Sequence, residues 1–301
     1  MRLRSLFTVL FGLALSTTLL FQSCSDTNST SPESAPNLSD RMEQEHRGET
    51  PTATEAALLE PAMPVTAEAV TYATVAGEPI TGYLAQPEGA EAGLPTIIAI
   101  HEWWGLNDNI RAMTERLAGE GYTVLAVDLY NSQVADTSAA ARQLMQAVMN
   151  DPEPAEANLQ QAFDYLVTEQ AASAIGSIGW CFGGGWSLQT GLLLPQQLDA
   201  LAIYYGRLVT EPEQLEPLQM PIIGFFGAED QAIPVEQVRE FEAALESLDK
   251  PAEIYIYEEA GHAFANPSGE RYAPEAAADA WAKTTEFFAQ YLQDTASSAV
   301  R

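Results

Sequence analysis

The sequence predicts an α/β fold, in which a mostly parallel, doubly wound sheet carries helices on both faces and begins with an antiparallel hairpin. Two observations predict it. From about residue 65 onward, short apolar runs alternate with segments whose apolar residues recur at helical spacing. Several of the runs, such as Thr96-Ile97-Ile98-Ala99-Ile100, are continuously apolar, as in strands that are covered on both faces.

The elements follow in order along the chain. A hairpin is expected over 69–75 and 78–85, because Ala76-Gly77 between them is typical of a tight turn. Further strands are expected at 96–100, 122–127, 175–180, 198–205, 221–226 and 252–257. Helices are expected at 108–119, 136–149, 154–169, 183–194, 235–248 and 274–293. A single domain over residues 63–295, followed by a short tail at 296–301, accounts for all of them.

Charge limits the partners of the protein. The 301 residues include 42 acidic and 13 basic side chains, which gives a formal net charge of −29 at pH 7. Phosphate binding needs clustered Lys and Arg, so no nucleic acid is expected as a partner. The only lysines are Lys250 and Lys283, and the acids are spread along the chain. This pattern is typical of halophilic proteins, in which salt screens the repulsion between the negative charges. A merely acidic exported protein is the alternative.

Residues 1–23 are predicted to be an export signal. Two arginines precede an apolar run over 6–21, and Cys24 follows in Gln22-Ser23-Cys24. A cysteine at this point is typical of bacterial lipoproteins, in which it becomes the lipidated first residue. We therefore expect a cell-envelope lipoprotein, periplasmic or on the outer surface, that touches the membrane only through this lipid anchor. A simply cleaved signal and an uncleaved membrane helix are the alternatives.

Residues 24–62 are predicted to be a flexible polar tether between the anchor and the domain. The segment is rich in Ser, Thr, Pro and Glu and has no sustained hydrophobic period, so it has little apolar surface to bury. His46 lies in this segment and is expected to be solvated. With Cys24 lipidated or removed, Cys181 is left without a disulfide partner.

The strongest local pattern is Gly179-Trp180-Cys181-Phe182-Gly183, between a predicted strand and a predicted helix. It matches a nucleophile elbow, with Cys in the place of the usual Ser. A nucleophile in so tight a turn leaves no room for side chains two residues away, which explains the glycines. The N-terminus of the following helix would favour a thiolate and an oxyanion. A glycine-rich turn around a small buried Cys is the alternative.

The partners that a nucleophile needs follow in the order expected for this pattern: an acid, then a histidine, each after a strand. Asp230 follows one strand, and His262, the only histidine beyond Cys181, follows the next. The sequence thus predicts a catalytic triad of Cys181, Asp230 and His262. Glu229 is the alternative acid.

Together the stretches GWCFGG, GAEDQAIP and EEAGHAFANP resemble the dienelactone hydrolases, or carboxymethylenebutenolidases, of the α/β-hydrolase superfamily. IIAIHEWWGLND and GYTVLAVDLY are similar to the N-terminal half of this family, so the resemblance covers about residues 65–293. It implies an α/β-hydrolase fold and hydrolysis of an ester or lactone of a small molecule through an acyl-thiol intermediate. No cofactor is expected, and we expect a monomer.

The resemblance also implies roles for residues near the first parallel strand. Glu102 matches a glutamate that contacts the resting thiol and assists its deprotonation. The backbone N–H groups of Trp103 and Phe182 would form the oxyanion hole. Trp104 could line the substrate pocket or belong to the core, and His101 is expected to have a structural role.

The sequence departs from the family at the substrate anchors. Family members that act on dienelactones hold the substrate carboxylate with arginines, one of them shortly after the catalytic histidine, where this chain has Asn266. Arg142 is a loose match for a second anchor, and its alternative is a solvated helix face. The weakened anchor argues against dienelactone itself as the substrate.

Other functions fit the sequence less well than hydrolysis does. No metal is expected, because one free Cys and two usable His form no recognised ligand cluster. No phosphate loop or dinucleotide fingerprint is present. A non-catalytic envelope lipoprotein that binds a small molecule and a thiol-based redox sensor using Cys181 are the alternatives. The acid–histidine pair favours the enzyme, because neither alternative needs it.

Overall fold

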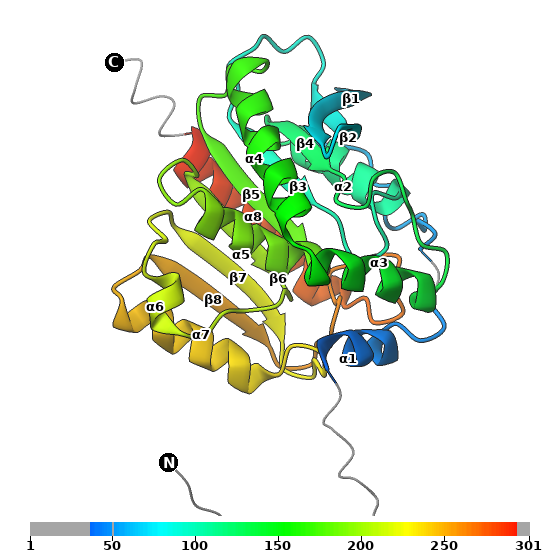
Figure 1. Cartoon of the computed structure of the whole chain (residues 1–301), viewed down its shortest axis with the longest axis vertical. Helices are drawn as coiled ribbons and strands as arrows, with labels where there is room; N and C mark the ends of the chain where they lie inside the picture. Colours follow the sequence, from blue (N-terminus) through cyan, green and yellow to red (C-terminus); the bar gives the residue numbers. More distant parts are fainter. Residues whose placement is uncertain (1–36, 50, 294–301) are drawn as a thin grey trace, which may run out of the picture. The chain divides into compact units, whose positions relative to one another are not determined.

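An eight-stranded sheet lies at the centre of the structure, a computed structural model that describes residues 37–49 and 51–293 (Figure 1). The strands are β1 (Val65–Val75), β2 (Glu78–Pro87), β3 (Thr96–Ile100), β4 (Thr123–Val127), β5 (Ile175–Trp180), β6 (Ala200–Tyr204), β7 (Ile222–Gly227) and β8 (Ala252–Tyr257). Their spatial order is β1-β2-β4-β3-β5-β6-β7-β8. All neighbours from β4 to β8 are parallel, and the β1–β2 hairpin pairs antiparallel with β4. The predicted sheet and hairpin are confirmed.

Helices cover both faces of this sheet. Successive residues of a strand point to opposite sides, so the contacts of two neighbouring residues of β5 identify the helix on each face. On β5, Ser177 Oγ lies 2.9 Å from Ser187 Oγ of α5 (Phe182–Leu193). A Cβ atom added at the preceding Gly176 would lie 3.0 Å from Phe288 of α8 (Pro274–Phe288). Helices α5 and α8 therefore cover opposite faces. On the α8 face, Arg116 of α2 (Asp108–Ala118) stacks 3.7 Å above the Trp281 ring.

The remaining helices are close to their predicted positions. They are α3 (Ser138–Asn150), α4 (Glu153–Thr168) and α7 (Val235–Ser247). The short helix α6 (Pro212–Leu215) was not predicted, and the last residues of the predicted closing helix form a π-helical turn, Ala289–Gln293. Every residue of β3, β4 and β6 is buried, as their continuous apolar runs predict. Truncating a core side chain such as Ile98 to Ala would cost about 2–5 kcal/mol.

The order of the strands also places the site. From β3 the chain crosses to β4 on one side and then returns to β5 on the other. In a parallel sheet, such a reversal opens a crevice at the carboxyl ends of the strands, where ligands bind. Cys181 follows β5, Asp230 follows β7 and His262 follows β8, so the predicted triad residues all lie at this edge.

The segment before the sheet differs from the prediction. Residues Leu38–Glu45 form helix α1, whose cap residue Asn37 accepts a hydrogen bond from Asp40 N at 3.1 Å. Thr54 N donates to Ser268 Oγ at 3.1 Å, so the chain beyond α1 also bonds to the domain. The prediction of a flexible tether over 24–62 is therefore wrong for the described residues from 37 onward. Apolar residues four apart, Leu38 and Met42, give α1 a face that packs on the domain.

The predictions for residues 1–23, for Cys24 and for the tail at 296–301 lie outside the described residues. Within the described part of the chain, no helix combines the length and the apolar character that crossing a bilayer requires.

Candidate active site

Cys181 sits in a strained turn between β5 and α5. Its backbone has φ 57° and ψ −116°, a conformation that costs a non-glycine residue about 1–3 kcal/mol. The turn is held because Cys181 N donates to Tyr204 O at 3.0 Å, and Gly184 N donates back to Cys181 O at 3.0 Å. As a result, the thiol lies at the N-terminus of α5, where the helix dipole favours negative charge.

The two glycines of this turn are required by close backbone contacts. A Cβ atom at Gly179 would lie 2.0 Å from Gly183 O, and one at Gly183 would lie 2.2 Å from Ile100 O. Neither neighbour is a side chain that could move aside. The glycine spacing seen in the sequence therefore reflects the packing of the turn against β3 and α5.

The acid and the histidine form a buried pair. His262 Nδ1 donates to Asp230 Oδ2 at 2.7 Å, and both side chains are fully buried. The other oxygen, Asp230 Oδ1, accepts from Ala232 N at 2.7 Å and from Ile233 N at 2.8 Å, so the carboxylate is fixed in place. Glu229, the alternative acid, is exposed and is not bonded to His262.

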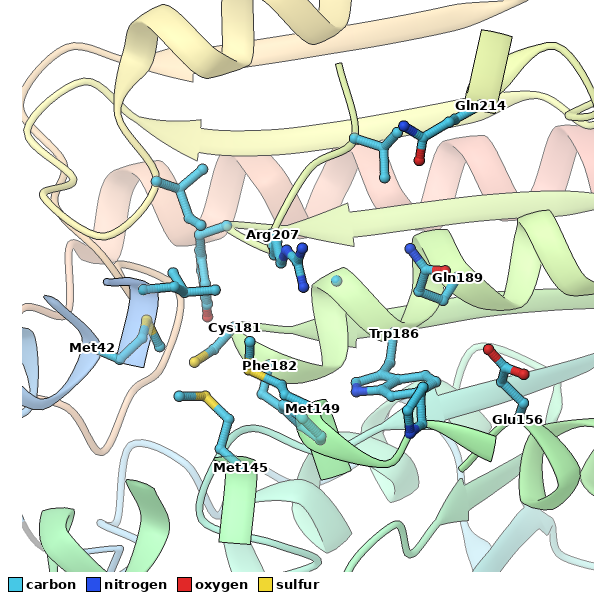
Figure 2. A pocket seen from close by; sticks show the side chains of 16 residues that line it. Met42, Met145, Met149, Glu156, Cys181, Phe182, Trp186, Gln189, Arg207 and Gln214 are labelled. Atoms are coloured by element: carbon cyan, nitrogen blue, oxygen red, sulfur yellow. The ribbon is translucent and has the colours of Figure 1, made fainter. Parts of the chain in front are cut away.

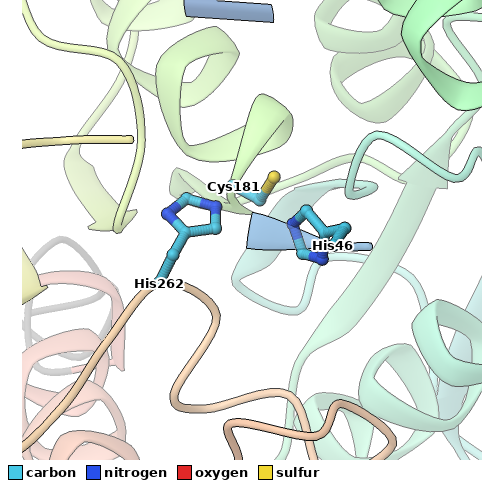
Figure 3. Close-up of side chains that lie close together, drawn as sticks. All are labelled: His46, Cys181 and His262. Carbon is cyan, nitrogen blue, oxygen red and sulfur yellow. The ribbon is translucent and has the colours of Figure 1, made fainter. Parts of the chain in front are cut away.

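The second nitrogen of His262 faces the thiol. Figure 3 shows this ring nitrogen turned toward Cys181. Burial acts to lower the pKa of His262, but the Asp230 carboxylate and Cys181 outweigh it and raise this pKa well above its ordinary value. Burial also raises the pKa of the Cys181 thiol, and His262 opposes that rise. Each group favours the charged form of the other, so the thiol and the imidazole titrate as a coupled pair that shares one proton.

A second histidine stands beside this pair. His46 of the N-terminal segment is 1% exposed, and its ring centroid lies 5.4 Å from that of His262 (Figure 3). The prediction that His46 is solvated is wrong. One ring nitrogen from each histidine and the Cys181 sulfur lie within 4.8 Å of one another, in an arrangement that could hold a metal ion. The prediction of no metal cluster assumed that His46 lies apart, and the fold removes that assumption.

Ionic contacts hold the His46 segment in place. His46 Nδ1 donates to Glu49 Oε2 at 2.6 Å, and Glu49 Oε1 pairs with Arg271 at 3.1 Å. Ser138 Oγ donates to His46 O at 2.7 Å. Burial lowers the pKa of His46 to about 4, so the ring is neutral near neutral pH. Arg271 Nε also donates to His262 O at 3.0 Å, which ties both histidine segments to one guanidinium.

Glu102 is a buried carboxyl group behind the thiol. Its Oε2 accepts a hydrogen bond from Asn266 Nδ2 at 2.8 Å, and its Oε1 has no partner within the described residues. Burial, followed by the negative charge of Glu49, raises the pKa of Glu102 to about 7. Glu102 can therefore exchange a proton near neutral pH. Asn266, which the sequence offered as a weak substrate anchor, is instead a partner of this carboxyl group.

Backbone N–H groups are available for an oxyanion. Phe182 is the first residue of α5, where an N–H has no partner inside the helix. In the described part of the chain, the Trp103 N–H makes no backbone hydrogen bond. The preceding His101 has the structural role that was expected, since its Nε2 accepts from Leu129 N at 3.1 Å.

A pocket of about 290 Å³ opens on Cys181 (Figure 2). Near the sulfur its wall is apolar, with Met42 from α1 and Met145 from α3. Farther away the wall mixes Trp186 with polar side chains. The polar side chains there are those of Glu156, Gln189, Arg207 and Gln214. Helix α1 thus forms part of the pocket.

Two predicted substrate contacts have other neighbours in the structure. Arg142 pairs with Asp40 and with Glu43 (2.9 Å) of α1, and it does not line the pocket. Trp104 is buried beside His46, with ring centroids 5.9 Å apart, and it too is absent from the pocket wall. Arg207, which no sequence motif indicates, does line it. Its place directly beyond a buried strand was the available signal.

Comparison with known proteins identifies the family. The model of the dienelactone hydrolase family matches residues 80–292. Two proteins provisionally assigned as carboxymethylenebutenolidases are each 32% identical to the chain. The match to the protein from Saccharolobus solfataricus covers 70% of this chain and 94% of that protein. The match to the protein from Synechocystis covers 71% of this chain and 93% of that protein. A crystal structure provisionally assigned as a dienelactone hydrolase, from Klebsiella pneumoniae, has a TM-score of 0.68 at 28% identity and covers 76% of this chain and 100% of its own. The chain therefore belongs to the dienelactone hydrolase family, which makes it a hydrolase of the α/β-hydrolase fold.

Proposed function

We propose that the protein hydrolyses an ester or lactone of a small molecule, with Cys181 as nucleophile, His262 as proton shuttle and Asp230 as the orienting carboxylate. The hydrogen bond of 2.7 Å between His262 and Asp230 carries this proposal, because it turns the other ring nitrogen toward Cys181. The strained turn that presents the thiol at a helix N-terminus adds support.

The reaction follows from this arrangement. Cys181 Sγ attacks the carbonyl carbon while its proton passes to His262 Nε2, and the Asp230 carboxylate stabilises the imidazolium that forms. The N–H groups of Phe182 and Trp103 receive the negative oxygen of the tetrahedral intermediate. Its collapse expels the alcohol, which takes the proton from His262, and leaves an acyl-thiol. A water molecule that gives its proton to His262 then attacks the acyl-thiol, releases the acid and restores the thiol.

Glu102 is proposed to assist the first proton transfer. Burial raises the pKa of the thiol, so the resting sulfur is a weak nucleophile. A carboxyl group whose pKa is about 7 accepts a proton at neutral pH more readily than an exposed glutamate does. Asn266 binds one carboxylate oxygen and leaves the other free, so Glu102 can take the thiol proton first and pass it on to His262 Nε2.

The pocket indicates the class of substrate. A volume of about 290 Å³ suits a small molecule. The methionines beside Cys181 favour an apolar group next to the reacting carbonyl, because a thioether side chain adapts to irregular apolar shapes. Arg207, on the pocket wall between Cys181 and Gln189, favours a carboxylate or another anionic group on the substrate.

Kinetics on a panel of aryl esters and lactones test the proposal. Cys181→Ala is expected to abolish turnover, and Asp230→Asn to lower kcat by about 10⁴-fold, since the histidine loses its correct tautomer. Glu229→Gln, which changes the exposed neighbouring acid, is the matched control and should keep the wild-type rate. Undiminished turnover by Cys181→Ala would contradict the proposal. A folded protein that binds such molecules and turns none over would favour the non-catalytic binding alternative.

We propose further that the protein is exported and anchored through a lipid on Cys24. The proposal rests on the sequence around residues 1–24 alone: a charged start, an apolar run and a following cysteine. In that setting the hydrolase would act outside the cytoplasm, on molecules that reach the cell envelope.

A further inference from the structure

The triad proposed above leaves His46 without a role. Its Nδ1 is held by Glu49, and its Nε2 is buried with no hydrogen-bond partner among the described residues. A buried polar atom without a partner destabilises the folded state. His262 is held through Nδ1 by Asp230, and its other ring nitrogen is turned toward the thiol of Cys181. One ring nitrogen of each histidine and the Cys181 sulfur lie within 4.8 Å of one another.

We propose that His46, Cys181 and His262 form a binding site for Zn²⁺ or a similar borderline-soft divalent cation. One sulfur and two imidazole nitrogens make a ligand set that suits zinc, with a fourth position left for water. Ligand atoms around a tetrahedral zinc ion lie about 3.3–3.8 Å apart, given bonds of about 2.0–2.3 Å. The three atoms lie within 4.8 Å of one another, so these distances would have to shorten by at most about 1.0–1.5 Å to complete the site.

The outer partners of both histidines are those typical of zinc sites. Zinc-bound histidines almost always donate their other N–H group to a carboxylate, a backbone carbonyl or water, which fixes the ring. Here Glu49 Oε2 accepts from His46 at 2.6 Å, and Asp230 Oδ2 accepts from His262 at 2.7 Å. Both imidazoles are thus oriented with Nε2 free, before any metal is bound.

The local charge also favours a divalent cation. The carboxyl groups of Glu49, Asp230 and Glu102 surround the three ligand residues, and Glu102 interacts electrostatically with both Glu49 and His262. Three buried acidic groups in one region repel one another unless positive charge is present. Arg271 supplies some positive charge, through its contact with Glu49 at 3.1 Å.

The site is formed by two distant parts of the chain. His46 comes from the segment that follows α1, whereas Cys181 and His262 come from the carboxyl edge of the sheet. Glu45 accepts from Gln231 N at 3.0 Å, next to Asp230, and so fixes the end of α1 beside the triad. Binding of a metal would therefore fasten the N-terminal segment over the nucleophile.

The chemical consequence is reversible inhibition, and this part rests on the proposed function. Binding forms one Zn–S bond and two Zn–N bonds, and the thiol proton leaves to solvent. The sulfur lone pair and the His262 Nε2 lone pair are then both engaged, so neither nucleophilic attack nor proton transfer is possible. Removing the cation and returning one proton restores the resting thiol. No electrons are gained or lost.

Titration of the chelator-treated full chain with Zn²⁺ in a calorimeter tests the binding, with Co²⁺ absorption as a second readout. Every variant carries Cys24→Ser, so that Cys181 is the one thiol. One Zn²⁺ per chain and a thiolate-to-Co²⁺ charge-transfer band are expected. His46→Ala should weaken Zn²⁺ binding by more than about 100-fold, and Glu49→Gln by about 10–100-fold. Gln44→Ala, an exposed position on α1, is the matched control and should bind as the parent does.

Rates in buffered Zn²⁺ test the consequence, each compared with the same variant in chelator. The parent should be inhibited at the free Zn²⁺ concentration at which it binds, and His46→Ala only at far higher concentrations. No stoichiometric binding, equal affinity in the parent and His46→Ala, or activation by Zn²⁺ would overturn the proposal. If no ester is turned over at all, the hydrolase proposal fails while the calorimetric result on the metal site still stands.

Discussion

The buried carboxyl group of Glu102 makes the stability of the protein depend on pH in a defined direction. Glu102 is 2% exposed, and burial together with the charge of Glu49 raises its pKa from 4.5 to about 7. An acid whose pKa is higher in the folded state binds more protons folded than unfolded, so folding loses stability as pH rises through this range. Glu102→Gln removes the titration but keeps the size of the side chain.

The magnitude follows from the two pKa values. At pH values below about 4.5 the acid is protonated in both states and contributes no penalty. Above about pH 7 the difference of about 2.5 units costs the folded state about 3 kcal/mol. Between about pH 5 and pH 8, the free energy of unfolding of Glu102→Gln should therefore rise relative to wild type by about 2–3 kcal/mol.

Urea denaturation at constant salt, with a chelator present, measures this difference across the pH range. Glu240→Gln, on the exposed face of α7, is the control for changing one charge on so acidic a protein. A difference between Glu102→Gln and wild type that stays constant with pH, or that shrinks as pH rises, would refute the reasoning about Glu102.

Three further predictions follow from the turn, the pocket and the N-terminus. Gly183→Ala should destabilise the fold by about 3 kcal/mol or more, seen as a lower urea midpoint, because its Cβ would lie 2.2 Å from Ile100 O. Arg207→Ala should raise KM about tenfold for an anionic ester and leave KM for a neutral ester unchanged, whereas Arg239→Ala, at an exposed position of α7, should leave both unchanged. An equal rise in KM for both esters on Arg207→Ala would contradict the pocket assignment. Cys24→Ser should move the expressed protein from the membrane to the soluble fraction, and continued sedimentation with membranes would argue against the lipid anchor.

The sheet and the turn at Cys181 were predictable because their signals are local. Buried parallel strands need continuous apolar runs, and the elbow needs glycines at fixed spacing. Both requirements are visible in a single stretch of sequence, such as Ile175–Gly183. The pairing of Asp230 with His262 was predictable for another reason: in a parallel sheet, residues after successive strands meet at one edge.

The N-terminal contribution to the site was missed because its signal is weak and its contacts are long-range. Asn37 as a helix cap and Leu38 with Met42 four residues later were the available local clues. What fixes the segment, however, is pairing with Arg142 and Arg271, far along the chain. Polar composition predicts disorder only when such partners are absent.

The residues that the family resemblance suggested as substrate anchors have other partners in this structure. Asn266 stands where a family arginine binds substrate, yet in this fold it binds Glu102 at 2.8 Å. Arg142 was matched loosely and pairs instead with α1. Arg207, at the carboxyl end of β6, takes up a position on the pocket wall that no motif indicated.

The central claim is that Cys181 carries the acyl group during turnover. Mass spectrometry of the protein, quenched in acid while it hydrolyses an aryl ester, tests this most directly. The expected result is an acyl adduct on the peptide that contains Cys181, which decays as substrate is exhausted and is absent from Cys181→Ala together with the activity. Turnover without any adduct on Cys181, or an adduct on another residue that forms as fast as the ester is cleaved, would contradict the account.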